Sequence, residues 1–135
     1  MSDHGFDLTI PAGLQPYTDD QILFRAILYK DWLSADKTKV KHQLFYRFTK
    51  DLSGLSVDTE AEACKANFQA PISGLVDLAA ERIRGVTHQD GSRLDVVPTT
   101  ATHGNIKRVP YRDDDRIEAT YIARQLAQVA HVYEV

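Results

Sequence analysis

An apolar stripe near the C-terminus constrains the fold of this chain more than any other sequence feature. Its residues recur at spacings of three and four, which places them on one face of a helix: Ala119, Ile122, Leu126, Val129, Ala130 and Tyr133. Three aspartates, Asp113 to Asp115, precede the stripe, where carboxylates cap free amide groups and meet the positive end of the helix dipole. The pattern predicts an amphipathic helix from about Asp113 to about His131. Its apolar face needs a surface to cover, most naturally a sheet formed around Ile22, Phe45 and Val96.

The rest of the chain divides into short extended segments and two further helices. Runs rich in β-branched, aromatic and large apolar residues predict strands over residues 22–28, 44–48, 55–57, 94–97 and 106–111. The acidic residues before the first run also suit a helix start, and its composition favours the strand. A capping box over Thr59–Glu62 predicts a helix through about Phe68, and a one-sided apolar cluster predicts another over Ser73–Arg84. We therefore predict an α+β fold, a single domain whose mostly antiparallel sheet is packed by about three helices, including the amphipathic C-terminal helix.

Residues 1–18 differ from the rest because Gly5, Pro11, Gly13 and Pro16 interrupt any regular element. We interpret residues 1–18 as an irregular N-terminal arm with a short strand over residues 6–10, and residues 19–135 as one α+β domain. The length of 135 residues lies near the commonest size of a single domain, and no repeat or linker divides the sequence.

Charge and cysteine content exclude several classes of protein. The formal net charge is −3, whereas a surface that coats duplex phosphate needs a large excess of Lys and Arg, so duplex DNA is not an expected partner. Cys64 is the only cysteine, which excludes an internal disulfide. The five histidines are scattered, so no metal site is predicted. Without a basic start before an apolar run, or about 20 consecutive apolar residues, we expect a cytoplasmic protein with no membrane segment.

Two arginines and one histidine are the candidate site residues. Arg25 stands within ILFRAIL and Arg47 within LFYRF, and a charge on a buried strand needs a partner or a ligand. Side-chain alternation offers the other explanation, because it can turn both arginines toward solvent. His103 follows a run of threonines, and a histidine among hydroxyl and backbone donors is typical of acid–base sites, although turn geometry also accounts for such a loop. His103 is the predicted catalytic residue.

Four segments together resemble known proteins: the strand with Arg25, the FYRF element with Arg47, the GLSV segment from Gly54 to Val57, and HGNI at His103. They are similar to a group of small bacterial proteins of unassigned role and to the RES-type branch of the ADP-ribosyltransferase fold. The second resemblance implies an NAD site in which an early-strand arginine and later polar residues hold the cofactor. It assigns Arg25, Arg47 and Ser56 to substrate binding.

The catalytic glutamate that occurs late in the ADP-ribosyltransferase fold has no clear counterpart in this sequence. Glu118 and Glu134 are its candidates only because they are the late glutamates of the chain. A site without that glutamate would bind its nucleotide without the family's catalysis, and the resemblance then implies binding alone.

Two functions follow from these features. The first is a non-catalytic accessory domain, without a cofactor, that binds itself or another protein through exposed aromatic residues: Tyr17, Trp32, Tyr111 and Tyr133. The second is an enzyme that acts on a nucleotide or on RNA ends. The enzyme hypothesis requires Arg25, Arg47 and His103 to converge on one pocket, and the weak specificity of the motifs favours the accessory domain.

Overall fold

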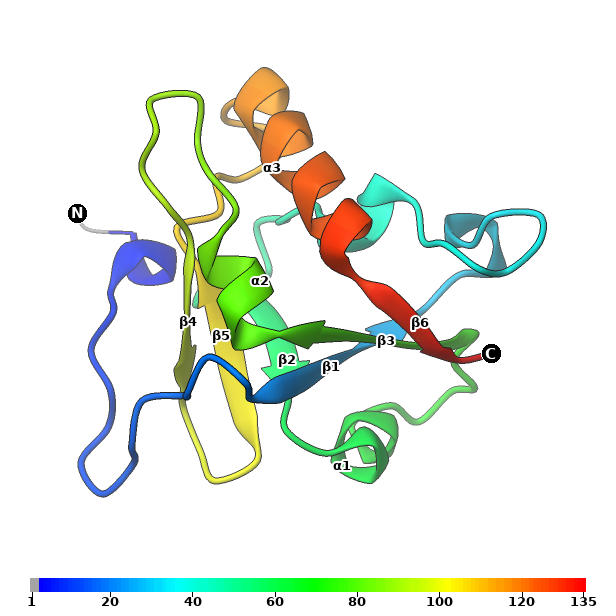
Figure 1. Cartoon of the computed structure of the whole chain (residues 1–135), viewed down its shortest axis with the longest axis horizontal. Helices are drawn as coiled ribbons and strands as arrows, with labels where there is room; N and C mark the ends of the chain where they lie inside the picture. The colour runs from blue at the N-terminus through cyan, green and yellow to red at the C-terminus, as the bar shows by residue number, and fades with distance from the viewer. Residues whose placement is uncertain (1–2) are drawn as a thin grey trace.

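Six strands form one antiparallel sheet in the computed structural model, which describes residues 3–135 (Figure 1). In sheet order they are β4 (Asp95–Pro98), β5 (His103–Lys107), β2 (Leu55–Asp58), β1 (Ile22–Ile27), β3 (Gly74–Ala79) and β6 (His131–Glu134). Figure 1 shows β4 and β5 running across the direction of β1, β3 and β6, so the sheet turns strongly between its two halves. The predicted α+β class with a mostly antiparallel sheet is confirmed.

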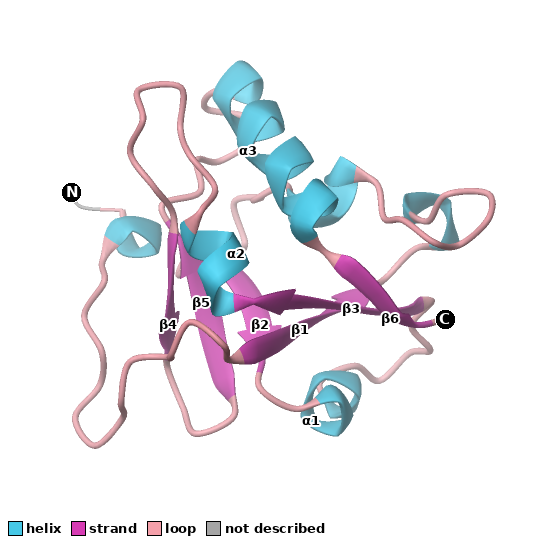
Figure 2. Cartoon of the chain, in the orientation of Figure 1, coloured by secondary structure: helices cyan, strands magenta, loops and turns pink. Residues whose placement is uncertain are grey.

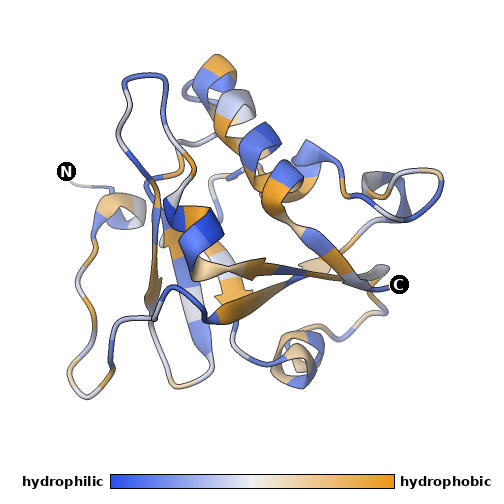
Figure 3. Ribbon diagram, in the orientation of Figure 1, coloured by the Kyte–Doolittle hydropathy of each residue, from blue (hydrophilic) through white to orange (hydrophobic). Residues whose placement is uncertain are grey.

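Three α-helices pack around this sheet (Figure 2): α1 (Ala61–Ala66), α2 (Ala80–Arg84) and α3 (Arg116–Val129). In Figure 1, α3 and α1 lie on opposite sides of the central strands β1 and β3. Three short 3-10 helices occupy the connections: η1 (His4–Phe6), η2 (Lys30–Trp32) and η3 (His42–Phe45). Figure 3 shows hydrophobic residues along β1 and β3, as expected for strands covered on both faces.

The C-terminal helix is present and its apolar face is buried as predicted, but it packs chiefly against the 3-10 helix η3, which contains Phe45, and not on a sheet through Ile22 and Phe45. Asp115 is its N-cap and accepts a hydrogen bond from the backbone N–H of Glu118 at 3.1 Å. Ala119, Ile122 and Leu126 are buried in the main core, and burial of an Ile or Leu side chain is worth about 1.5–3 kcal/mol. The helix ends at Val129, whereas the apolar stripe continues to Tyr133, because the chain becomes extended and pairs with β3 as strand β6.

Two predicted elements in the middle of the chain are wrong. Residues 44–48 do not form a strand, since Leu44 and Phe45 end the 3-10 helix η3 and are both buried. Residues 73–84 do not form one helix, since residues 74–79 are strand β3 and only residues 80–84 are helical. Strand β3 pairs with β1 at six positions and is buried on both faces. Such a strand lacks the alternation of a half-exposed one, so its apolar run resembles one face of a helix.

Three local predictions also differ from the structure. Residues 6–10 form no strand; instead Asp3 caps η1 by accepting from the backbone N–H of Gly5 at 2.8 Å. The capping box does not form, because Thr59 bonds the carbonyl of Thr102 and helix α1 begins after Glu60 with no side-chain cap. Residues 103–105 are not a loop but the first half of strand β5.

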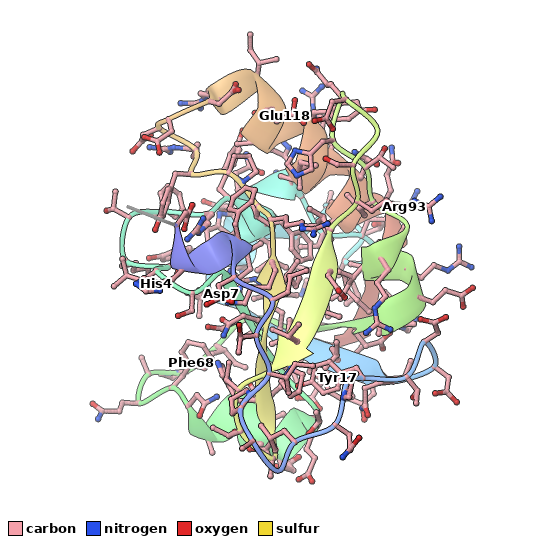
Figure 4. The ribbon with its side chains drawn as sticks, turned by 90° about the vertical axis from the view of Figure 1, so that its left-hand side faces the viewer. His4, Asp7, Tyr17, Phe68, Arg93 and Glu118 are labelled. Atoms are coloured by element: carbon pink, nitrogen blue, oxygen red, sulfur yellow. The ribbon has the colours of Figure 1, made fainter. Side chains whose placement is uncertain are left out.

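The N-terminal arm lies along the outer side of β4 and β5, where Figure 4 labels His4, Asp7 and Tyr17 on its path. The backbone N–H of Arg108 donates to the carbonyl of Gly5 at 2.7 Å. The buried ammonium of Lys107 donates to the carbonyl of His4 at 3.0 Å. The arm therefore holds polar groups that the sheet buries and contributes to the fold.

The sheet opens between its two central strands, β1 and β2. Strand β1 pairs with β3 along its whole length but meets β2 at one pair of residues, Phe24 and Asp58. Beyond that pair the two strands diverge, and the backbone groups on their facing edges need other partners. This divergence positions the candidate site.

Candidate functional site

A pocket of about 690 Å³ opens where β1 and β2 diverge. Its polar wall comes from β1, from β2 and from the start of β5: Arg25, Ser56, Asp58 and His103. Its aromatic wall comes from η2, from the segment around η3 and from the end of α1: Tyr29, Trp32, Tyr46, Phe48 and Phe68. We call this the site pocket. A pocket of this size that combines aromatic walls with a few polar groups has the character of a small-molecule site.

Arg25 fills the gap between the diverging strands with its guanidinium group. Its Nε donates to the carbonyl of Leu44 at 3.1 Å and its Nη1 to the carbonyl of Ser56 at 2.8 Å. The bond to Ser56 satisfies a β2 backbone acceptor on the edge that faces β1, and the bond to Leu44 joins β1 to the 3-10 helix η3. The side chain is half-buried, so the explanation that alternation turns Arg25 into solvent does not hold.

The charge of Arg25 is not neutralised by a carboxylate within residues 3–135. The ion pairs among these residues involve other cations, and both partners of Arg25 are neutral carbonyl oxygens. Burial lowers the pKa of Arg25, while Asp51 opposes this shift through its charge. Arginine stays protonated in proteins, so a cation lines the site pocket with capacity for an anionic ligand.

His103 lines the same pocket and is oriented by a buried carboxylate. Its Nδ1 lies 3.1 Å from Oδ1 of Asp58, and Asp58 also accepts from the side-chain amide of Asn67 at 3.1 Å. Asp58 is only 5% exposed, so these two bonds meet its need for partners. An Nδ1–H that donates to Asp58 leaves Nε2 as the acceptor of the imidazole, the arrangement that a general base requires.

Strand register brings Ser56 beside this pair. Ser56 is paired with Asn105 and Asp58 with His103 across β2 and β5, so these four residues share one face of the sheet. Ser56 is exposed and its carbonyl holds Arg25. The structure therefore brings Arg25, Ser56 and His103 together in the site pocket.

Arg47 does not line the site pocket. Its side chain is fully buried, and its five N–H groups donate to six acceptors, two of them the carboxylate oxygens of Asp3 at 2.7 and 2.8 Å. Its guanidinium also lies 3.7 Å from the ring centroid of Tyr111. These contacts use its donors, so Arg47 joins the arm to the core and is a structural residue. Of the two arginines predicted to lie in one pocket with His103, only Arg25 lines that pocket.

The two late glutamates lie away from the site pocket. Glu118 accepts from the backbone N–H of Gln89 at 2.9 Å and contacts His88 Nδ1 at 3.1 Å, and Figure 4 shows it at the opposite end of the molecule from Phe68. Glu134 pairs with Lys65 at the sheet edge at 2.7 Å. The carboxylates that do line the pocket are Asp51 and Asp58.

Sequence reasoning missed Asp58 and the aromatic wall. Asp58 stands two residues after Ser56 and directly follows the predicted strand over residues 55–57, which ends one residue later in the structure. A strand continued by that one residue places the side chains of Ser56 and Asp58 on one face. The aromatic residues come from segments whose chain path the sequence did not reveal. Of the four aromatic residues predicted to be exposed, Tyr133 is half exposed, whereas Tyr17, Trp32 and Tyr111 are half-buried.

Comparisons of this chain with protein-family models, with curated proteins and with solved structures give no match. Within residues 3–135, no group of three or more His, Cys, Asp or Glu residues is placed to hold a metal ion. No helix in the described part of the chain has the length and apolar character to span a membrane.

Proposed function

We propose that the site pocket binds a nucleotide, with NAD as the first candidate, and that His103 serves as a general base there. The observation that carries this proposal is Arg25, a residue of the pocket lining whose guanidinium has only neutral carbonyl partners. Charge-assisted bonds from a guanidinium to a phosphate are among the strongest hydrogen bonds in proteins. The resemblance to the ADP-ribosyltransferase fold assigns the same residue, together with Ser56, to the NAD site.

The aromatic wall supports a nucleotide over a simple anion. Tyr29 and Trp32 form an edge-to-face pair with ring centroids 4.8 Å apart, and Tyr46 and Phe48 form a second pair at 6.4 Å. Aromatic faces of this kind stack with nucleobases. A ligand with an anionic group and a flat heteroaromatic ring would contact both walls of the pocket at once.

The pair of His103 and Asp58 supports a reaction at this site. With Nδ1–H held by Asp58, the Nε2 atom of His103 can accept the proton of an attacking hydroxyl group. In an ADP-ribosyl transfer, that hydroxyl would bond to the ribose carbon as nicotinamide leaves. No glutamate lines the pocket among residues 3–135, so this chemistry would differ from the glutamate-dependent catalysis that the resemblance implies.

Thermal-shift measurements with NAD, ADP-ribose, ADP and AMP test the binding. A ligand at 100 times its Kd stabilises the folded state by about 2.7 kcal/mol, which corresponds to a shift of several degrees for a domain of this size. Arg25→Gln should weaken binding by about tenfold or more, because it removes the charge-assisted bonds. Arg25→Lys keeps the charge, and Arg82→Gln removes an exposed arginine outside the pocket as a matched control.

The outcomes separate binding from chemistry. Equal shifts in wild type and Arg25→Gln would refute the nucleotide site. If His103 is the base, His103→Gln should keep the shift with NAD but lower nicotinamide release by about 10²- to 10⁴-fold. Nicotinamide release that does not change in His103→Gln would contradict the catalytic role and leave the binding proposal in place.

A protein-interaction role is the second candidate, because the described residues place strand β6 at the edge of the sheet with Tyr133 half exposed. An unpaired strand edge is a template for pairing with another chain. Light scattering coupled to size exclusion should then report a dimer that Tyr133→Lys weakens. A monomer at all protein concentrations would contradict self-association.

A further inference from the structure

Gln43 presents a polar group in the site pocket that the fold does not use. Its side-chain oxygen Oε1 is buried and has no hydrogen-bond partner among residues 3–135, although the residue lines the pocket. Buried polar atoms are nearly always hydrogen-bonded, since an unmet acceptor costs stability. At a pocket wall, such an atom is an acceptor that a donor group of a ligand can use.

Gln43 lines the pocket, and its backbone connects it to a residue of each wall. Gln43 directly precedes Leu44, whose carbonyl oxygen holds the guanidinium of Arg25. Its own carbonyl accepts from the backbone N–H of Tyr46, a residue of the aromatic wall, at 3.3 Å. A nucleotide with its phosphate at Arg25 and its ring against the aromatic wall would thus bring a ring edge toward Gln43.

We infer that the side-chain amide of Gln43 recognises the ligand's heteroaromatic ring by hydrogen bonds to the amino or carboxamide group at its edge. A primary amide carries two donors and an acceptor, and the terminal torsion of glutamine is soft, so the group can turn to present its oxygen and nitrogen together. Two groups of NAD match this pattern: the 6-amino group of adenine beside a ring nitrogen, and the carboxamide of nicotinamide. Both offer an N–H donor beside an acceptor, the complement of the glutamine amide.

This inference rests on the proposed nucleotide site and makes Gln43 a specificity residue within it. A site built to hydrogen-bond a donor discriminates strongly against an analogue that lacks it, because the buried acceptor is then left unpaired. An apolar residue of the same length removes that penalty. Gln43→Met is therefore expected to lose discrimination between ring edges while it keeps the anion site at Arg25.

Titration calorimetry with three probes tests the inference: NAD, nicotinic acid adenine dinucleotide and nicotinamide 1,N6-ethenoadenine dinucleotide. The second probe replaces the carboxamide by a carboxylate, and the third bridges N1 and N6 of the adenine, so each lacks the N–H donor at one of the two ring edges. Wild type should bind one of the two analogues at least tenfold more weakly than NAD, which identifies the ring at Gln43. Gln43→Met should reduce that ratio to within about threefold, whereas the exposed control Gln128→Met should retain it.

A structural role for Gln43 predicts different results. If Gln43 only supports the fold, Gln43→Met lowers the unfolding midpoint and keeps the wild-type selectivity, which would overturn the inference. If Gln43 is a ligand-reading residue, the unfolding midpoint without ligand stays the same or rises, because the variant no longer buries an unpaired oxygen. If the wild type binds all three probes with Kd values within twofold of one another, and this binding depends on Arg25, the inference about Gln43 is wrong and the proposed nucleotide site is supported. Wild type that binds none of them would overturn both.

Discussion

Cys64 lines the site pocket, yet we expect its thiol to be chemically inert in the folded protein. Burial raises the pKa of Cys64 to about 12, and the charge of the nearby Asp58 acts in the same direction. At pH 8 roughly one thiol in 10⁴ would be ionised, and the thiolate is the reactive form. Native protein should therefore react with a thiol-specific disulfide reagent orders of magnitude more slowly than protein unfolded in urea. Absorbance of the released thiolate measures both rates.

A fast reaction of the native protein with the thiol reagent at pH 8 would contradict an inert thiol. It would show that the thiol of Cys64 reaches solvent, although the residue is only 2% exposed. Addition of NAD provides a further control under the proposed function, because a ligand in the pocket should not accelerate the reaction.

The two arginines show why sequence alone could name candidate residues but not assign their roles. Arg25 and Arg47 both stand in apolar, aromatic-rich segments, and each was open to the same two explanations. Arg47 finds Asp3, 44 positions away, whereas Arg25 finds only carbonyl oxygens. A partner at that separation depends on the tertiary path of the chain, which no local pattern contains.

At the scale of elements, we expect the N-cap of helix α3 to contribute measurably to the stability of the fold. The carboxylate of Asp115 accepts from the backbone N–H of Glu118, a donor that the first turn would otherwise leave unpaired. Asp115→Ala should lower the free energy of unfolding by about 1 kcal/mol. Asp114→Ala, one residue earlier, is the matched control, because it removes the same charge near the helix dipole without removing a cap bond.

Urea denaturation followed by circular dichroism gives both values. Equal losses in Asp115→Ala and Asp114→Ala would assign the effect to the helix dipole alone. A loss confined to Asp115→Ala would support the geometric cap, and an unchanged midpoint in both variants would contradict a role for either.

Elements with a simple exposure pattern could be predicted, and the others could not. Helix α3 has one buried face and a capped N-terminus. The spacing of its apolar residues and the aspartates before them therefore predicted both the helix and where it begins. Strand β3 is buried on both faces, and its run of apolar residues carries no period that separates strand from helix. The segment before Arg47 has strand-like composition, yet it turns as a 3-10 helix because both Leu44 and Phe45 enter the core.

At the scale of the whole molecule, the α+β class and the antiparallel sheet followed from the sequence, whereas the site depended on the sheet's topology. Strand β1 lies at the centre with β2 on one side and β3 on the other, and the pocket lies where β1 and β2 part beyond their single register pair. No local signal gives that order. The sequence identified three candidate residues from their chemical types: Arg25, Ser56 and His103. They come together because β2 pairs with both β1 and β5.

The ion pair of Asp3 and Arg47 joins the N-terminal arm to the wall of the site pocket. Arg47 also donates to the carbonyl of Asp51, a pocket residue, at 2.8 Å. Asp3→Ala should lower the free energy of unfolding by about 1–3 kcal/mol, because Arg47 loses its counter-charge but keeps its other acceptors. Asp7→Ala removes an exposed carboxylate from the same arm and should leave the midpoint nearly unchanged.

The effect of Asp3→Ala should depend on pH in a definite direction. Hydrogen bonding to Arg47 lowers the pKa of Asp3 below its ordinary value of 3.8, against the opposing effect of burial. A carboxylate with a lowered folded-state pKa contributes its stability above the unfolded-state pKa, and that contribution is lost as the pH falls through the folded-state pKa. The difference between wild type and Asp3→Ala should therefore be constant above about pH 5 and shrink below about pH 4. Urea midpoints from pH 7 to pH 3 measure it, and a difference that grows toward acid pH would contradict the assigned ion pair.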